Sequence, residues 1–252
     1  IKSAREIELM REAGRILAKV HEELGKAIQP GMSTLDIDRL GEKLIRGFGC
    51  VPSFKNYNGY PASICVSVNN EVVHGIPNKH HIIQEGDIVS LDAGVIYKGY
   101  HSDAARTHAV GQISPEAQKL IDVTRQSFFE GIKFAKAGNH LNDLSSAIQA
   151  YAESFGYGVV RDLVGHGIGS HLHEDPEVPN FSRNRKGIKL VPGMTLAVEP
   201  MINIGTPNVE WLDDDWTVVT EDGSLAAHYE NTILITEGEP EILTLSHTEE
   251  DL

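Results

Sequence analysis

The chain has 252 residues, of which 40% are hydrophobic and 23% charged, a composition typical of a soluble globular protein with one large core or two modest ones. Its 36 acidic against 22 basic side chains give a net charge of −14, which argues against a general nucleic-acid binder such as a DNA-binding protein. No stretch reaches the roughly 20 apolar residues that cross a bilayer, the N-terminus lacks a signal-peptide pattern, and two cysteines cannot build a disulfide framework, so we expect a cytoplasmic protein.

Two helices are expected at the start of the chain. Ser3 followed by Glu6 is a capping-box pattern, and apolar residues then recur at helical spacing until Pro30-Gly31 ends the helix. A second helix is expected next, with Ser33 or Thr34 as its cap. The apolar residues expected on one face of this second helix are Ile37, Leu40, Leu44 and Phe48. Residues 63–68 and 87–110 are predicted to be strands.

The helical pattern restarts near residue 112. Ser114-Pro115 is a helix start, and the helix is expected to reach about Ala137 before Gly138 breaks it. The motif of a glycine break and a helix ending in Phe-Gly, residues 31–49, recurs at residues 138–156 with every matched residue displaced by 107. Either chance produces this match, or two related halves, about 1–112 and 113–252, pack as one domain of residues 1–252 with a cleft between them.

A pair of aspartates in the predicted strands is the first chemical signal. If Lys98-Gly99 is a two-residue hairpin loop, Gly94 faces Asp103. Asp92 then points to the same sheet face as Asp103, close enough for a cation to bridge them. The alternative places one aspartate in a turn and the other on an exposed edge. The apolar neighbours of Asp92 favour a buried strand and therefore a metal site.

A glycine-rich segment, residues 165–176, contains three histidines, namely His166, His171 and His173. A single histidine is more often a structural hydrogen-bonding residue, but three favour a metal ligand together with a proton-transfer partner. The spacing and lysine of a Walker phosphate loop are absent from this segment.

Two isolated glutamates, Glu199 and Glu230, lie in apolar, strand-like runs. Each is either on an edge strand facing water or buried as a metal ligand, because a lone charge is rarely buried without a partner. Four carboxylates and one imidazole suit a dinuclear site for Mn²⁺, Fe²⁺, Co²⁺ or Zn²⁺. The acidic excess is thus either a solvated surface or in part a cation site.

These residues together resemble the five metal ligands of the methionine aminopeptidases. The resemblance covers nearly the whole chain and implies an α+β, "pita-bread" fold: two pseudo-symmetric halves around a central antiparallel β-sheet with flanking helices. The segment Glu-Val-Val-His-Gly-Ile-Pro at 71–77 resembles the methionine aminopeptidases rather than the prolidases, which usually carry an N-terminal domain that this chain lacks. The lack of a long insertion in the second half and of a zinc-binding extension before the first half resembles the short type I enzymes of bacteria. The matching positions are Asp92, Asp103, His166 in Gly-His-Gly-Ile-Gly, Glu199 in Val-Glu-Pro-Met, and Glu230.

The resemblance implies that these five residues hold two divalent metal ions, with Asp103 and Glu230 as bridging ligands. It also implies metal-assisted hydrolysis that removes the N-terminal methionine, with a preference for a small second residue. Glu199 would accept the proton of the attacking water, and His173 would stabilise the oxyanion. His74 would contact the substrate amide.

The family's methionine pocket maps onto Tyr57, Tyr60, Cys65, Leu172 and Trp216. Leu172 departs from the family pattern, in which an aromatic residue is common, and Phe54 stands where a cysteine is sometimes found. Both remain apolar. His101 and His171 have no role in this scheme and are expected at the surface.

The expected partners are the N-termini of nascent polypeptides near the ribosome, and the protein is expected to be a monomer that binds neither DNA nor membranes. Two alternatives stay open: an Xaa-Pro aminopeptidase or dipeptidase with the same fold, and a non-catalytic peptide-binding module. Residues 249–252 are expected to form a frayed acidic tail.

Overall fold

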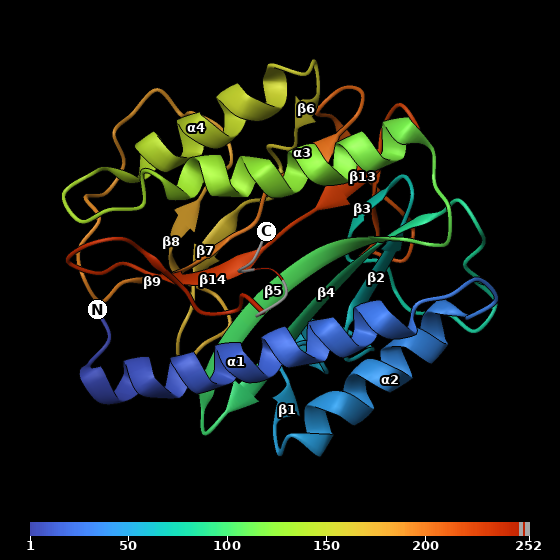
Figure 1. Ribbon diagram of the computed structural model, residues 1–252, viewed down its shortest axis with the longest axis horizontal. Helices are drawn as coiled ribbons and strands as arrows, with labels where there is room; N and C mark the ends of the chain where they lie inside the picture. Colours follow the sequence, from blue (N-terminus) through green and yellow to red (C-terminus); the bar gives the residue numbers. More distant parts are fainter. Residues whose placement is uncertain (247–248, 250–252) are drawn as a thin grey trace.

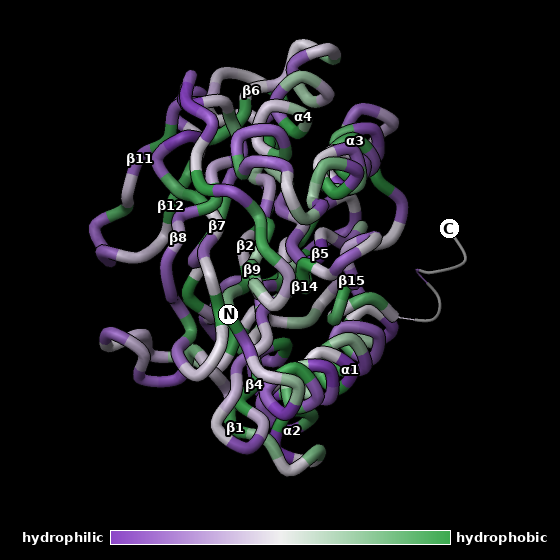
Figure 2. Tube along the Cα trace, turned by 90° about the vertical axis from the view of Figure 1, so that its left-hand side faces the viewer, coloured by the Kyte–Doolittle hydropathy of each residue, from purple (hydrophilic) through white to green (hydrophobic). Residues whose placement is uncertain are grey.

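The computed structural model describes residues 1–246 and 249, and it consists of helices that flank antiparallel sheets. Figure 1 shows α1, α2, α3 and α4 on the near side, with the long strands β4 and β5 and the strand β14 behind them. The same layering is visible from the side in Figure 2, where α1 and α3 lie on one flank and β11 and β12 on the other. The expected acidic tail falls, except for Glu249, outside the described residues.

The first part of the chain contains two helices and a sheet. The bounds of its elements are α1 Ala4–Ala27, α2 Thr34–Gly47, β1 Val51–Pro52, a 3-10 helix Tyr57–Gly59, β2 Cys65–Val68, β3 Glu71–Val73, β4 Ile88–Tyr97 and β5 Tyr100–Ala109. Strands β1, β2 and β5 all pair antiparallel with β4. The predicted strand segments are therefore confirmed.

The second part repeats the two-helix start and continues in short strands. The bounds are α3 Pro115–Ile132, α4 Leu141–Glu153, β6 Gly158–Val159, β7 Gly165–Gly167, β8 Glu174–Val178, β9 Thr195–Val198, β10 Met201–Asn203, β11 Val209–Trp211, β12 Val218–Thr220, β13 Ala226–His228, β14 Asn231–Leu234 and β15 Glu241–Ile242. A five-stranded antiparallel sheet has the order β15-β14-β9-β7-β8, and two three-stranded sheets have the orders β13-β10-β6 and β11-β12-β3.

The helix starts agree with the sequence patterns. Ser3 and Ser33 cap α1 and α2 in complete capping boxes, and Ser114 caps α3. The expectation for the end of α2 was wrong, because Phe48 is its exposed C-cap and not a buried face residue. The fully buried positions of that helix include Ile37 and Ile45.

The two helix pairs keep the spacing seen in the sequence. Leu141, the first residue of α4, lies 107 positions after Thr34, the first residue of α2. Helix α3 ends at Ile132, earlier than expected, because residues 134–136 form tighter turns that hydrogen-bond three or fewer residues back. The helix pairs cover separate cores: α1 and α2 pack on the β2-β4-β5 sheet, whereas α3 and α4 pack on residues of β9 and β14.

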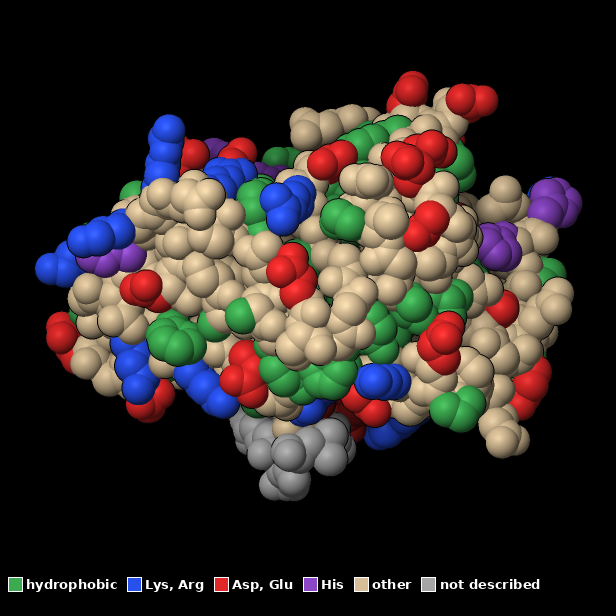
Figure 3. Space-filling model, turned by 90° about the horizontal axis from the view of Figure 1, so that it is seen from above, with side chains coloured by type: hydrophobic (Ala, Val, Ile, Leu, Met, Phe, Trp, Pro, Cys, Tyr) green, Lys and Arg blue, Asp and Glu red, His purple; other side chains and the backbone are tan. Residues whose placement is uncertain are grey.

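Most of the acidic side chains of the described residues lie at the surface. Seen from above, Asp and Glu side chains are spread over the face among Lys and Arg (Figure 3). Cys50 and Cys65 are buried free thiols. None of the helices in the described part of the chain is long and apolar enough to span a membrane.

Candidate metal centre and substrate pocket

The β4–β5 hairpin presents the two aspartates as the sequence predicts. Tyr97 pairs with Tyr100 and Gly94 with Asp103, so the loop is Lys98-Gly99, both with positive φ (46° and 87°). This conformation at both loop positions matches the right-handed twist of the strands and fixes the register. Asp92 and Asp103 therefore share a face, and both are buried.

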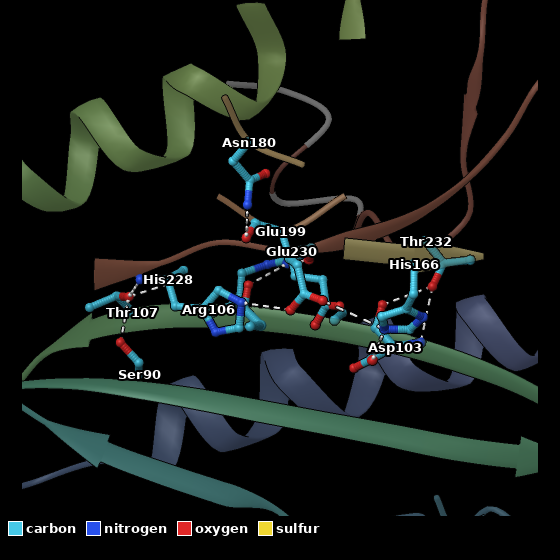
Figure 4. Close-up of polar contacts among 12 residues, drawn as sticks. Ser90, Asp103, Arg106, Thr107, His166, Asn180, Glu199, His228, Glu230 and Thr232 are labelled. Carbon is cyan, nitrogen blue, oxygen red and sulfur yellow. Dashed lines mark hydrogen bonds and ion pairs between the residues drawn. The ribbon is translucent and has the colours of Figure 1, made fainter. Parts of the chain in front are cut away.

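The other predicted ligands come from the five-stranded sheet that meets this hairpin. Glu199 directly follows β9, Glu230 directly precedes β14, and His166 on β7 lies opposite Ala197 of β9. The backbones of Ala105 and Glu230 exchange two hydrogen bonds of 3.0 and 3.2 Å, which join β5 to the start of β14. Figure 4 shows Asp103, His166, Glu199 and Glu230 converging between these strands.

A buried arginine, Arg106, donates hydrogen bonds to both strands at this junction. Arg106 Nη1 donates to the carbonyl oxygens of Ala105 (2.8 Å) and Glu230 (2.6 Å), and Nη2 donates to Asn231 Oδ1 (2.8 Å). Asp103 N donates to Thr232 Oγ1 at 3.0 Å. The strands that carry the carboxylates are thus cross-linked by hydrogen bonds on both sides of Glu230.

The five predicted ligands, together with His228, form two groups, within each of which the candidate ligand atoms all lie within 4.8 Å of one another. Glu230 belongs to both groups, as expected of a bridging carboxylate, whereas Asp103 belongs to only one of them. The first group is Asp92, Glu199, His228 and Glu230, and the second is Asp103, His166 and Glu230. Two adjacent cation positions that share Glu230 fit this arrangement.

The carboxylates lack the donors that buried carboxylates require. Oδ1 of Asp92, Oδ1 of Asp103 and both carboxylate oxygens of Glu230 are buried without a hydrogen-bond partner among the described residues. Burial, followed by the charge of Asp103, raises the pKa of Asp92 and of Glu230 well above the usual range. Burial is the largest single influence on Asp103 and disfavours its anion, but the hydrogen bond and the charge of His166, together with the neighbouring carboxyl groups, outweigh burial and lower the pKa of Asp103 to about 2. Divalent cations are the partners that this donor set fits.

The His166 ring is oriented for ligation. Its Nδ1 donates to the carbonyl oxygen of Gly167 at 2.8 Å, which leaves Nε2 facing Asp103 (3.4 Å) and Glu199 (3.5 Å). Burial alone would lower the pKa of His166, yet the hydrogen bond with Asp103 and the charge of Glu199 raise it to about 9. A ligating histidine commonly has its other ring nitrogen fixed by a backbone carbonyl in this way.

His228 is a site residue that the sequence analysis missed. It is 1% exposed, and its Nε2 lies 3.1 Å from Glu199 Oε2. A carboxylate oxygen only accepts hydrogen bonds, so the His228 nitrogen donates. In Figure 4 Glu199 lies between the rings of His228 and His166. One feature of the sequence could have identified His228. It lies two residues before Glu230 in a strand-like run, and this spacing places both side chains on the same face of the strand.

Replacement of His228 should weaken the metal centre without removing a predicted ligand. We expect His228→Ala to lower Mn²⁺ affinity about tenfold or more, since an unsupported Glu199 carboxylate loses its fixed orientation. His228→Gln keeps an N–H donor and should lose less. Titration of chelated protein with Mn²⁺ measures both constants, and unchanged affinity in His228→Ala would show that Glu199 needs no such support.

A cavity of about 260 Å³ opens beside the carboxylates. All five predicted pocket residues line it, and so does Phe54: the five are Tyr57, Tyr60, Cys65, Leu172 and Trp216. Val73, Leu163 and Met201 complete its apolar wall and were not predicted, because each reads in the sequence as ordinary core. Asp92, Asp103, His166 and Glu199 line the same cavity, so a bound apolar side chain lies next to the metal centre.

Tyr60 and Trp216 form a rigid wall of this cavity. Their rings meet edge to face with centroids 5.1 Å apart, and the Tyr60 hydroxyl donates to the carbonyl oxygens of Ile64 and Gly75. The backbone of Trp216 is held by Asp214 Oδ1, which accepts from its N–H at 2.8 Å. The aromatic side chains therefore do not depend on a ligand for their positions.

His74 lines the same cavity in a strained backbone conformation. Its φ is +59°, in the left-handed region that non-glycine residues adopt rarely. The next residue must be glycine, because a Cβ at Gly75 would lie 2.1 Å from the carbonyl oxygen of Val66. Burial lowers the pKa of His74, so its ring is neutral near pH 7 and can donate one hydrogen bond.

The three remaining histidines near the site differ in their surroundings. His173 lines the cavity although its side chain is exposed, and partial desolvation there, followed by the nearby His166, lowers its pKa. His171 is exposed, as expected. The expectation for His101 was wrong: it is half-buried, and its Nδ1 hydrogen-bonds Ser53 Oγ at 2.9 Å because β5 brings it against the segment after β1.

Comparison with known proteins identifies relatives of the whole chain. The model of metallopeptidase family M24 matches residues 8–237. The methionine aminopeptidase of Clostridium acetobutylicum is 59% identical over 245 residues, which are 97% of this chain and 98% of that protein. The crystal structure of methionine aminopeptidase from Thermotoga maritima has a TM-score of 0.95 at 46% identity and covers 98% of this chain and 99% of its own. The Xaa-Pro dipeptidase of Bacillus anthracis has a TM-score of 0.79 at 29% identity, over 98% of this chain and 62% of its own.

Proposed function

The chain belongs to metallopeptidase family M24, and on this basis we propose that its buried carboxylates hold two divalent cations for peptide hydrolysis. It has the pita-bread fold and is a metal-dependent hydrolase that removes N-terminal methionine, as its near-full-length relatives are methionine aminopeptidases. The observation that carries the proposal is the set of buried, unpartnered carboxylate oxygens in two groups that share Glu230. The ligands are Asp92, Asp103, His166, Glu199 and Glu230.

Divalent cations at such a site supply Lewis acidity, which polarises a carbonyl and lowers the pKa of water. The chain's own residues do the rest. Glu199, which borders the cavity, accepts the proton of the attacking water. His173 donates a hydrogen bond to the carbonyl oxygen as it becomes negative, and His74 contacts the substrate amide.

The apolar cavity accounts for the methionine preference. The thioether side chain is unbranched and flexible, so it fills a pocket walled by aromatic and aliphatic side chains. Leu172, where an aromatic is common in the family, is 2% exposed and keeps that wall apolar. Tyr57, Tyr60, Cys65 and Trp216 supply further contacts with the substrate.

The natural substrates in this proposal are nascent polypeptides that emerge from the ribosome in the cytoplasm, and the enzyme works as a monomer. The second residue of the substrate is small. The cations are Co²⁺, Mn²⁺, Fe²⁺ or Zn²⁺, since oxygen ligands with one imidazole suit this range.

The number of cations is the part of the proposal that is tested first. Chelated protein is titrated with Mn²⁺, and bound metal is counted after desalting. We expect two ions per chain, with activity on Met-Ala-Ser rising as they bind. A single ion at full activity would contradict the dinuclear site, and faster cleavage of Xaa-Pro peptides would contradict the methionine pocket.

A further inference from the structure

Tyr57, in the wall of the substrate cavity, is hydrogen-bonded to His173. The Tyr57 hydroxyl and His173 Nδ1 are 2.8 Å apart, and the two ring centroids are 5.3 Å apart. These residues are separated by 116 positions in the chain. The contact therefore joins the loop after β1 to the glycine-rich segment before β8.

The other nitrogen of the His173 ring is free. Nε2 of His173 has no hydrogen-bond partner among the described residues, and the ring lines the cavity together with Asp103, His166 and Glu199. The His173 ring lies edge-on to that of His166, with centroids 4.1 Å apart. The free nitrogen is therefore the one available to a substrate carbonyl.

A neutral imidazole has one donor nitrogen and one acceptor nitrogen. A tyrosine hydroxyl that donates to Nδ1 requires Nδ1 to be the acceptor, which places the ring proton on Nε2. Burial raises the pKa of the Tyr57 hydroxyl, so this group keeps the proton that it donates. Of the two neutral tautomers of His173, only the Nε2–H form can donate from this nitrogen to a developing oxyanion.

We propose that Tyr57 is a positioning residue for His173: its hydroxyl donates to Nδ1, orients the ring and holds the ring proton on Nε2, towards the scissile carbonyl oxygen. This inference rests on the proposed function, in which His173 stabilises the oxyanion. Tyr57 thereby connects the wall of the methionine pocket to His173. Loss of this contact should lower the rate of the chemical step and leave substrate affinity unchanged.

A double-mutant cycle in the metal-loaded enzyme tests the proposal, with kcat and KM measured on Met-Ala-Ser for Tyr57→Phe, His173→Ala and the double variant. We expect Tyr57→Phe to lower kcat about tenfold with little change in KM, and to have no further effect when His173 is absent. Tyr100→Phe is the matched control, because it loses a hydroxyl hydrogen bond to Glu6 (2.7 Å) outside the cavity. An unchanged kcat in Tyr57→Phe, or equal losses in both backgrounds, would overturn the proposal.

A second readout does not depend on turnover. Histidine-specific ¹⁵N labelling of the zinc-loaded protein, with the His173 signals assigned by their loss in His173→Ala, reports which ring nitrogen carries the proton. We expect the Nε2–H form in the wild type and a shift away from it in Tyr57→Phe. The same tautomer in both proteins would overturn the proposal, whereas a wild type that fails to release methionine would count against the proposed function itself.

Discussion

Glu230→Ala should abolish methionine release and metal loading together. Glu230 is fully buried, both its carboxylate oxygens lack hydrogen-bond partners among the described residues, and it belongs to both ligand groups. In the proposed dinuclear site its removal takes one ligand from each cation, and we therefore expect kcat/KM to fall by about 10³-fold or more. Metal content after desalting should drop from two ions per chain to one or none.

The stability of the metal-free variant separates this effect from misfolding. Glu230 lies among other buried carboxylates, so its loss relieves repulsion, and metal-free Glu230→Ala should melt no lower than metal-free wild type. Added Mn²⁺ should raise the melting temperature of the wild type but not that of the variant. Glu210→Ala, at an exposed strand position, is the control. Full dinuclear occupancy in Glu230→Ala would contradict its assignment as a ligand.

His173→Ala should lower turnover and leave the metals in place. The loss of one preorganised donor to the oxyanion costs about 10²-fold or more in kcat. His173 belongs to neither ligand group, so metal content and Mn²⁺ affinity should equal those of the wild type. Steady-state kinetics on Met-Ala-Ser, together with metal analysis of the same sample, measure both quantities.

The neighbouring histidine provides the control for that experiment. His171 lies two positions away, has an exposed side chain and does not line the 260 Å³ cavity. His171→Ala should retain wild-type turnover. If His173→Ala kept full kcat, the oxyanion would be stabilised without it, and if it lost metal, its role would be structural.

The parts of the site that local geometry determines could be predicted from the sequence. A two-residue loop fixes hairpin register, so the position of Lys98-Gly99 between the two strands is enough to place Asp92 and Asp103 on one face. The capping boxes at Ser3 and Ser33 likewise mark the helix starts. In both cases the deciding residues are within a few positions of one another.

The contacts that were missed join segments far apart in the chain. His228 reaches Glu199 across 29 positions, and Tyr57 reaches His173 across 116. No periodicity or spacing encodes such a pair, because the way the sheets meet decides which side chains face each other. Phe48 illustrates a different limit, since helical spacing does not tell at which residue a helix ends.

Metal-dependent removal of a single methionine can be measured on the wild-type protein itself. Chelated wild-type protein is incubated with a Met-Ala-Ser peptide, with and without added Mn²⁺ or Co²⁺, and the released amino acids are quantified. We expect release of methionine alone, and only when a divalent cation is present. Release without any cation, or no release with any cation from folded protein, would contradict it.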